Sequence, residues 1–244
     1  MAFQPQPLTE VRQAHCEVCP IKKLAFCGRL DSDTQAALYR VSQQIKLAPH
    51  YHIFQEDEPA DSAFQLLEGA AKAYKVLPDG RVHLIGFIMP GDLVGLSGRG
   101  LWGHGIYSCS VETLVPSVVC RYPAHQLGKL SERFPDLKRS LLERTGTLLN
   151  AAQERMVLLG RRSAAERVAH FMVSLVERAE SAGGPSGEAW VPARQQDIAD
   201  HLGLTPETVS RVWADFRREG LIRPCDSRHI VITDRSALLT YSQP

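Results

Sequence analysis

Short apolar runs separated by turn residues fill the chain from about Ile45 to Arg121. The runs are HYHIFQ, SAFQLLEG, AKAYKVL, VHLIGFI, DLVGL and SVVCRY. Several of them alternate apolar and polar positions, which is typical of half-buried strands. Pro78-Asp79-Gly80 stands between two alternating runs and predicts a hairpin turn. Many short strands at near-regular spacing predict a small antiparallel β-barrel or jelly roll.

Helical spacing replaces this alternation from His125 to about Leu159. The apolar and small positions with a period near 3.5 residues are Leu141, Thr145, Leu148, Ala152, Met156 and Leu159. So narrow a seam favours a helix that pairs with its twin in a homodimer; the alternative is one amphipathic helix packed on its own barrel. Ahead of the strands, residues 1–14 look polar and loose, and residues 30–44 predict a short helix capped by Asp31 or Ser32.

The region after the pairing helix predicts a further helix and a small sheet. Ser163 followed by Glu166 has the spacing of a capping box, which starts a helix that runs to about Ala182. A loop, SAGGPSG, follows this helix. Near the end of the chain, residues 220–222 and 229–232 predict two short strands that form a wing.

The stretch QQDIADHLGLTPETVSRVWA, residues 195–214, predicts two short helices joined by a tight turn. Gly203 tolerates the positive φ of such a turn, Thr205 suits an N-cap, and Pro206 suits the first helical position. The positions expected to face inward are Ile198, Ala199, Leu202, Leu204, Val209, Val212, Trp213 and Phe216. Small or β-branched residues at the expected crossing point favour a helix-turn-helix.

The outward face of the second helix carries the side chains that we expect to read DNA. They are Glu207, Thr208, Ser210 and Arg211. Arginine donates two hydrogen bonds to guanine, glutamate accepts one from cytosine, and serine can do either. The candidates for phosphate contacts are Arg217, Arg218, Arg223 and Arg228. The alternatives are an ion pair between Glu207 and Arg211, a solvated arginine face, and an ordinary helical hairpin in an enzyme core.

Composition and overall charge exclude some classes of protein but do not indicate a function by themselves. The chain has 244 residues and a net charge of +1, so charge alone does not indicate nucleic acid. The N-terminus lacks a charged flank followed by an apolar run, and no apolar stretch approaches the length of a membrane span. We therefore expect a cytoplasmic protein without a membrane partner. No Ser/His/Asp set, phosphate-binding loop or pair of carboxylates indicates an enzyme.

Three cysteines stand close together in HCEVCPIKKLAFC. Cys16 and Cys19 form a C-x2-C pair and Cys27 follows, which indicates metal or cluster ligation in a reducing compartment. Zinc would take a histidine or another cysteine as its fourth ligand, and an iron–sulfur cluster would usually take a fourth thiolate. Cys109 or Cys120 could supply that thiolate. A thiol–disulfide centre and plain structural cysteines are the alternatives.

The order of barrel, pairing helix and winged helix-turn-helix resembles the CRP/FNR superfamily of bacterial transcription regulators. The segments that carry the resemblance are PGDLVG, VCRYP, SAAERVAHFM and LGLTPETVSRV. The resemblance implies an α+β fold in four parts. These are a cysteine-rich segment (1–29), an antiparallel β-barrel like a cyclic-nucleotide-binding jelly roll (30–124), a dimerisation helix (125–160) and a winged helix-turn-helix domain that binds DNA (161–244).

Within the superfamily, the cysteine pattern resembles the FNR branch, which senses oxygen. That resemblance implies a [4Fe-4S] cluster held by Cys16, Cys19, Cys27 and Cys120, with Cys120 preferred over Cys109 because its VC-x-x-P context matches. The reader residues resemble the branch's E-x-x-S-R pattern. The resemblance therefore implies a homodimeric activator of anaerobic gene expression that contacts RNA polymerase and binds double-stranded DNA at a palindrome like TTGAT-N4-ATCAA.

Other sensors of the superfamily provide the rival interpretations. Its cyclic-nucleotide branch has an arginine followed by serine or threonine after the G-D/E-L loop, whereas Arg99 is followed here by Gly100, which argues against cAMP. Haem could bind through a barrel histidine such as His50, His52 or His83. A purely structural zinc site is a further variant.

Overall fold

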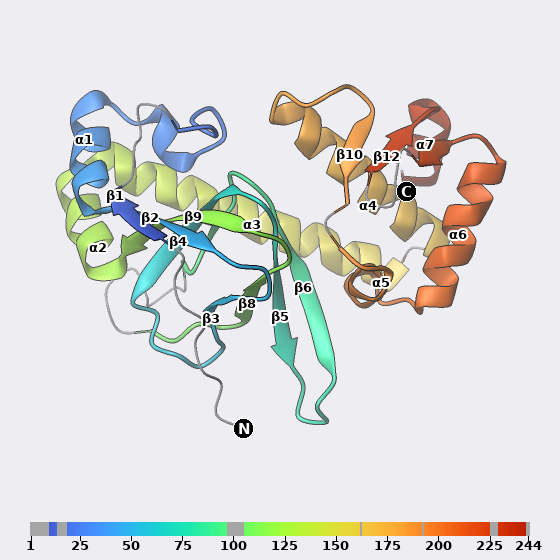
Figure 1. Cartoon of the computed structure of the whole chain (residues 1–244), viewed down its shortest axis with the longest axis horizontal. Helices are drawn as coiled ribbons and strands as arrows, with labels where there is room; N and C mark the ends of the chain where they lie inside the picture. The colour runs from blue at the N-terminus through green and yellow to red at the C-terminus, as the bar shows by residue number, and fades with distance from the viewer. Residues whose placement is uncertain are drawn as a thin grey trace. The chain divides into compact units, whose positions relative to one another are not determined.

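The computed structural model describes residues 10–13, 19–96, 105–161, 163–191, 193–224 and 229–242. The chain forms two compact units, Met1–Leu148 and Leu149–Pro244, and the helix α3 (Pro135–Arg161) contributes to both. Figure 1 shows the elements of each unit along the chain. No helix among the described residues is long and apolar enough to cross a membrane.

Two antiparallel sheets make up most of the first unit. One has the strand order β1-β2-β9-β4-β7 and the other β3-β8-β5-β6. The strands are β1 (Glu10–Gln13), β2 (Gln43–Leu47), β3 (His52–Phe54), β4 (Ser62–Glu68), β5 (Ala71–Val76), β6 (Val82–Ile88), β7 (Leu93–Val94), β8 (Ser110–Thr113) and β9 (Ser117–Pro123). The strands β5 and β6 pair across the predicted hairpin turn, where Gly80 has a φ of +83°. The predicted α+β fold with an antiparallel jelly-roll-like barrel is confirmed.

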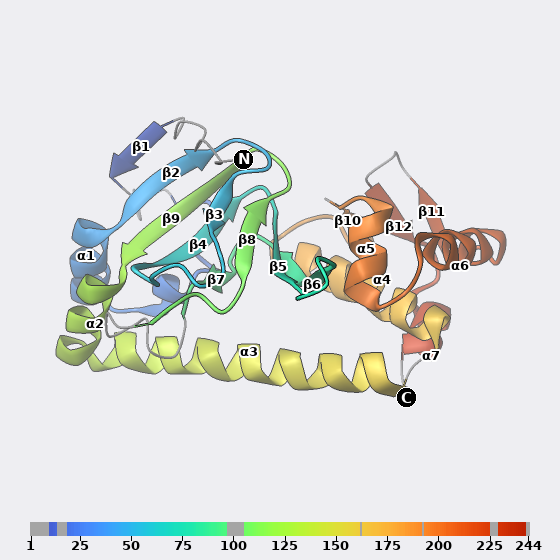
Figure 2. The same ribbon diagram turned by 90° about the horizontal axis from the view of Figure 1, so that it is seen from below.

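The five-stranded sheet separates two apolar cores. In β9, Val119 belongs to the core between the two sheets, together with Phe54 and other aromatic side chains. Its neighbours Cys120 and Tyr122 belong to a second core on the outer face of the sheet. The elements that cover this outer face are residues 21–30, α1 (Ser32–Val41), α2 (Ala124–Arg133) and the first part of α3 (Figure 2). Both faces of β9 are therefore buried.

Two helix boundaries differ from the sequence prediction. The first helix has the expected cap, because the Asp31 carboxylate accepts the Thr34 N–H at 2.8 Å. It ends at Val41 rather than Gln44, since the residues that follow pair with β9 as β2. The long helix predicted after the barrel is two helices, α2 and α3. Pro135 disfavours a helical conformation at the preceding Phe134, which is extended with a ψ of 100°.

Besides β2, which was partly predicted as helix, two strands of the first unit lie outside the sequence prediction. The strand β1 falls in a segment that we expected to be loose, and it pairs with β2 at the edge of the sheet. The strand β8 pairs with β3 and β5, and its four residues, SVET, are too few to show a period. Both strands depend on partners that are distant in the sequence.

The exposed face of α3 begins one residue later than the predicted seam. Leu141 is buried in the chain's own core, whereas 62% of Leu142 is exposed. Of the other predicted seam positions, Leu148 is exposed and Leu159 is half-buried. The exposed apolar or small positions that share one face are Leu142, Thr145, Leu149, Ala152 and Met156. They are spaced alternately by three and four residues, which is the heptad spacing of a coiled coil.

The second unit contains the predicted helices and a larger sheet than expected. Its elements after α3 are α4 (Ala164–Ser181), β10 (Glu188–Trp190), α5 (Gln195–Leu202), α6 (Pro206–Arg218), β11 (Ile222–Pro224), β12 (His229–Ile232) and α7 (Arg235–Ser242). The capping box of Ser163 and Glu166 is confirmed at the start of α4. The predicted wing strands are β11 and β12, and the unpredicted β10 joins them in the order β10-β12-β11. The helix α7, which packs on α4, was also not predicted.

Candidate nucleic-acid interface and cysteine site

The turn between α5 and α6 has the geometry that the sequence predicts. Gly203 is left-handed, with a φ of +62° and a ψ of 42°. The N–H groups of Gly203 and Leu204 both donate to the carbonyl of Ala199, which closes the end of α5. Ala199 and Val209 are fully buried where the two helices pack. Leu204 and Trp213, which we expected to be buried, are half-buried.

The start of α6 is fixed by its own side chains. Thr205 is the N-cap, as predicted, and its hydroxyl accepts the Thr208 N–H at 3.3 Å. The two threonine hydroxyls are also bonded to each other at 3.1 Å. The Glu207 carboxylate accepts its own backbone N–H and the Thr205 hydroxyl, and these bonds hold its pKa below the usual value. A carboxylate is therefore kept ionised at the positive end of the helix.

The expected reader residues lie on the outward side of α6. Glu207, Ser210 and Arg211 are exposed, while Thr208 is half-buried because it takes part in the cap. Within the described residues Glu207 and Arg211 form no ion pair, so the Arg211 guanidinium is not engaged by Glu207, whose carboxylate accepts its own N–H and the Thr205 hydroxyl. The outcome for the phosphate candidates is that Arg217 and Arg223 are exposed, Arg218 is exposed but pairs with Asp215 at 2.7 Å, and Arg228 lies outside the described residues.

Two arginines that the sequence analysis did not single out support the turn from behind. Arg155 of α3 donates to the Nδ1 and the carbonyl oxygen of His201, at 2.7 and 2.9 Å. Arg167 of α4 donates to the carbonyls of Leu202 and Leu159, at 3.0 and 2.9 Å. Cations at the C-terminal end of a helix satisfy its last carbonyls and its dipole. These bonds attach the end of α5 to the last turns of α3.

Three of the candidate cysteine ligands, Cys19, Cys27 and Cys120, lie around one core. Cys19 and Cys27 are half-buried and pack against the outer-face core that contains Cys120, of which only 4% is exposed. Cys109 instead packs against the core between the two sheets. Cys16 lies outside the described residues. The arrangement thus separates Cys109 from the other described cysteines, on opposite sides of the five-stranded sheet.

The residue types at this site, but not their spacing among the described residues, fit a thiolate-bound group. The segment that carries Cys19 and Cys27 is packed onto the sheet, where Phe26 meets Tyr122 edge-on with ring centroids 5.4 Å apart. Within the described part of the chain, no three His, Cys, Asp or Glu side chains are grouped closely enough to hold a metal ion. The described thiols border one core but are not drawn together at one point, and Cys16, the remaining candidate ligand, lies outside the described residues.

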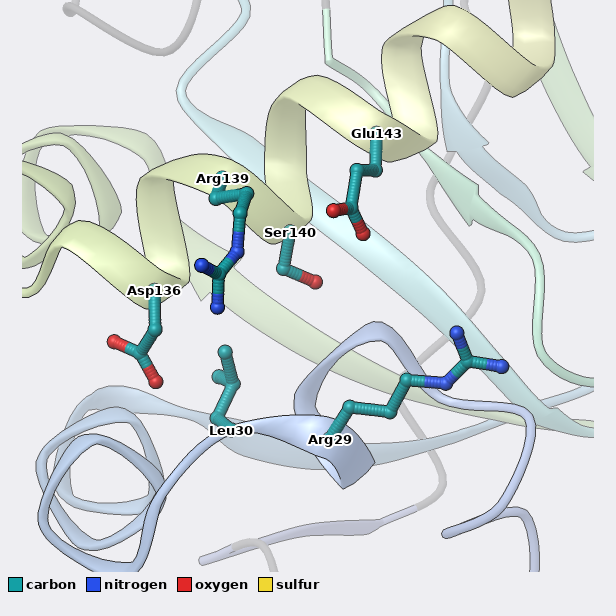
Figure 3. A pocket seen from close by; sticks show the side chains of 6 residues that line it. All are labelled: Arg29, Leu30, Asp136, Arg139, Ser140 and Glu143. Atoms are coloured by element: carbon teal, nitrogen blue, oxygen red, sulfur yellow. The ribbon is translucent and has the colours of Figure 1, made fainter.

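A polar pocket of about 460 Å³ marks the junction of this segment with α3 (Figure 3). Its lining residues are Arg29, Leu30, Asp136, Arg139, Ser140 and Glu143. Asp136 accepts the Asp31 N–H at 3.2 Å and the Thr34 hydroxyl at 3.0 Å. One turn further along α3, the Ser140 hydroxyl donates to the Phe26 carbonyl at 3.0 Å. The cysteine-bearing segment is thus attached to the first turns of α3.

The barrel contains a second pocket, of about 410 Å³. It is lined mainly by apolar and aromatic side chains, with Asp61 and Arg121 among its polar residues. None of the histidines considered for haem is among the described residues that line it: His50 bonds to Glu112 at 2.9 Å, His52 bonds to the Tyr74 hydroxyl at 2.8 Å, and His83 is exposed on β6. Arg99, on which the argument against cAMP rests, lies outside the described residues.

Two family models match the chain. A Crp-like helix-turn-helix domain matches residues 166–241. A cyclic nucleotide-binding domain matches residues 44–134. The two matches cover most of the second unit and the barrel of the first.

Individual proteins of known name match over most of their length. The transcriptional activatory protein AadR of Rhodopseudomonas palustris is 38% identical over 217 residues, which cover 88% of this chain and 89% of that protein. The nitrogen fixation regulation protein FixK of Bradyrhizobium diazoefficiens is 36% identical, with 85% of each chain covered. The solved structure of FixK2 from Bradyrhizobium japonicum superposes with a TM-score of 0.76 at 31% identity, covering 84% of this chain and 98% of that one.

Proposed function

Because the chain belongs to the CRP/FNR family of transcription regulators, we propose that it is a homodimeric activator that senses oxygen through a [4Fe-4S] cluster. Membership makes the chain a DNA-binding transcription regulator and not an enzyme. The proposed sensing rests on one observation: the thiols of Cys19 and Cys27 border the same core as Cys120. Activation is supported by relatives that are named transcriptional activators, and we propose that it proceeds through contact with RNA polymerase.

We assign the reading of DNA to α6. Arg211 would donate to guanine O6 and N7, Glu207 would accept from cytosine N4, and Ser210 would complete the set. All three side chains are exposed. Arg217 and Arg218 would contact phosphates and set the register without reading sequence. The expected half-site is TTGAT, repeated as TTGAT-N4-ATCAA.

The dimer that such a palindrome requires would form along α3. The face that runs from Leu142 to Met156 is apolar, has heptad spacing, and is exposed in the single chain, with 72% of Met156 accessible. Pairing of two such faces would bury them and set two copies of α6 about 34 Å apart, one turn of DNA. The bonds from Arg155 and Arg167 would carry the position of α3 to the reader helix.

The cysteines would connect this assembly to oxygen. Cys16, Cys19 and Cys27 would hold the cluster from the N-terminal segment, and Cys120 would hold it from β9. The cluster, when bound, supplies an iron–sulfur centre whose stability depends on oxygen. Engaged thiolates would fix the segment on the sheet and, through Ser140 and Asp136, on α3. Released thiolates would remove that restraint and weaken the dimer.

The test is purification of the full chain without air, followed by assays of iron and sulfide and by DNA binding. We expect about four irons and four sulfides per chain, broad visible absorption that bleaches in air, and tighter binding to the palindrome before exposure than after. Fluorescence anisotropy with the palindrome and with a scrambled duplex measures the affinity.

A pair of matched variants assigns the ligand on the sheet. Cys120→Ala is expected to abolish iron binding, whereas Cys109→Ala, which changes the thiol on the other side of the sheet, is expected to retain it. A colourless, iron-free protein that binds the palindrome equally in air and without air would refute the oxygen sensor. It would leave a regulator with another signal, such as haem or thiol oxidation.

A further inference from the structure

A buried glutamine lies between the cysteine site and the dimer helix. Gln65 of β4 is fully inaccessible to solvent, and its strand partner in β9 is Cys120. A buried amide retains its place only when both of its ends are hydrogen-bonded. The two ends of Gln65 reach different parts of the first unit.

The oxygen end of the amide faces the thiol side. Its Oε1 accepts the Tyr122 hydroxyl at 3.4 Å and lies 3.9 Å from Sγ of Cys27, in position for a weak S–H donor. The nitrogen end points the other way, and Nε2 donates to the carbonyl of Gly91 at 3.3 Å. The orientation of the amide is therefore matched to hydroxyl and thiol donors on one side and to a carbonyl acceptor on the other.

The Gly91 carbonyl is also held by α3. Nη2 of Arg144, two turns beyond Asp136 on the same helix, donates to this oxygen. The backbone at Gly91 also approaches Leu24 closely, because a Cβ at Gly91, whose φ is +96°, would lie 2.9 Å from Cβ of Leu24. Gly91 thus receives one hydrogen bond from the cysteine side, through Gln65, and one from the dimer helix.

We propose that Gln65 is a positioning residue that couples Cys27 to Arg144 of α3 through the Gly91 carbonyl. The Cys27 thiol and the Tyr122 hydroxyl hold Oε1 on one side of the amide, which leaves Nε2 facing the Gly91 carbonyl. Loss of the thiol contact leaves the amide freer to turn. Turning the amide places Oε1 against the Gly91 carbonyl, and since both oxygens are acceptors, that bond is lost.

This inference concerns regulation of the cysteine site and rests on the proposed function for its biological meaning. Its physical content, however, is a coupling between Cys27 and Arg144 that exists in the iron-free protein. The chain offers a matched control in Gln44, the partner of Cys120 on its other side. Gln44 is half-buried, and its side chain makes no hydrogen bond within the described residues.

A double-mutant cycle tests the coupling in the reduced, iron-free full chain. Cys27→Ala and Arg144→Met are made singly and together in three backgrounds: the parent, Gln65→Met and Gln44→Met. Hydrogen–deuterium exchange measures opening of the loop at the amides of Gly91 and Leu66, which bond across the loop at 2.9 and 3.0 Å. In the parent and Gln44→Met backgrounds, we expect the double substitution to change the exchange rates by a factor that differs about fivefold from the product of the two single factors. This is the deviation expected for residues of one hydrogen-bond network.

In the Gln65→Met background, the effect of the double substitution on the exchange rates should equal the product of the effects of Cys27→Ala and Arg144→Met. Effects that already multiply in the parent, or a coupling that persists in Gln65→Met, would overturn the proposal. Cys27→Ser keeps a donor and Arg144→Lys keeps a cation, so each should restore coupling that the first substitutions remove. These rescues decide the question if Gln65→Met does not fold. A chain that never binds iron would refute the oxygen sensor without affecting this result, and a chain that binds iron without the coupling would refute only the role of Gln65.

Discussion

Replacement of Arg155 by methionine would test whether α3 holds the DNA-reading motif in place. Methionine preserves much of the apolar stem of the side chain and removes the guanidinium. The guanidinium donates both to Nδ1 and to the carbonyl of His201 in the last turn of α5. The substitution therefore removes the bonds that α3 donates to the end of α5. The bonds that Arg167 of α4 donates remain.

The expected cost follows from the two bonds and from their burial. A hydrogen bond that involves a charged group contributes about 1.5–3 kcal/mol, and a buried acceptor left unsatisfied costs about 1–3 kcal/mol. Burial acts in the opposite direction, because it disfavours the charged form and lowers the pKa of Arg155 to about 10. The group still carries its charge at neutral pH. Combining these effects, we expect the variant to lose about 2 kcal/mol of the free energy of unfolding of the second unit.

Urea unfolding followed by tryptophan fluorescence measures this loss. Trp190 and Trp213 both belong to the second unit and report on it. The matched control is Arg139→Met, at an exposed arginine of the same helix that makes no hydrogen bond or ion pair within the described residues. We expect the control to change the stability by less than about 0.5 kcal/mol.

The reasoning would be refuted by an Arg155→Met variant that unfolds at the same urea concentration, and with the same slope, as the parent. Such a result would mean that the two bonds only replace equivalent bonds to water. If the loss of stability is found, anisotropy measurements should also show weaker binding of Arg155→Met to the palindrome, because the reader helix is no longer held at the end of α3.

Three further predictions concern DNA, the dimer and acid. Arg211→Ala is expected to weaken palindrome binding by about 1–3 kcal/mol and to relax the base preference, whereas Arg217→Ala should weaken all sequences alike and lower the salt slope by about 1. Met156→Glu should raise the dimer dissociation constant, measured by sedimentation, by more than about tenfold, because a buried unpaired charge costs several kcal/mol. The Gly187 N–H and a neighbouring arginine hold the pKa of Glu180 below its usual value. The stability from this carboxylate is present above that usual value and lost as the pH falls through the folded-state pKa, so Glu180→Gln should flatten the decline of the urea midpoint in acid.

Each of these predictions has a result that would contradict it. Equal losses on the palindrome and on scrambled DNA for Arg211→Ala would argue against base reading by that side chain. The seam would be wrong if Ala151→Glu, on the exposed side of α3 away from it, weakened the dimer as much as Met156→Glu. Parallel acid profiles of the parent and Glu180→Gln would show that this carboxylate has the same pKa in the folded and unfolded chain.

Short-range signals in the sequence correctly predicted the turn and the helix starts of the DNA-binding domain. Gly203 marks the left-handed turn, Thr205 caps the second helix, and Ser163 opens the capping box, and all three are confirmed. Each signal acts through the conformational preference or hydrogen bonding of a few adjacent residues. The break before Pro135 belongs to the same class, and its signal was present in the sequence although the prediction ran a single helix through it.

Contacts between distant segments were decided only by the tertiary structure. The strand β4 is buried on both faces, so no alternation could indicate that Gln65 faces the cysteine layer and Phe64 the interior of the barrel. The acceptor of Arg155 lies 46 residues further along the chain, and nothing near Arg155 points to it. The sequence by itself determined the turns, the caps and the kinds of element, because local sterics and hydrogen bonds fix them. Which face is covered, and by which partner, depended on how apolar surfaces far apart in the chain are buried together.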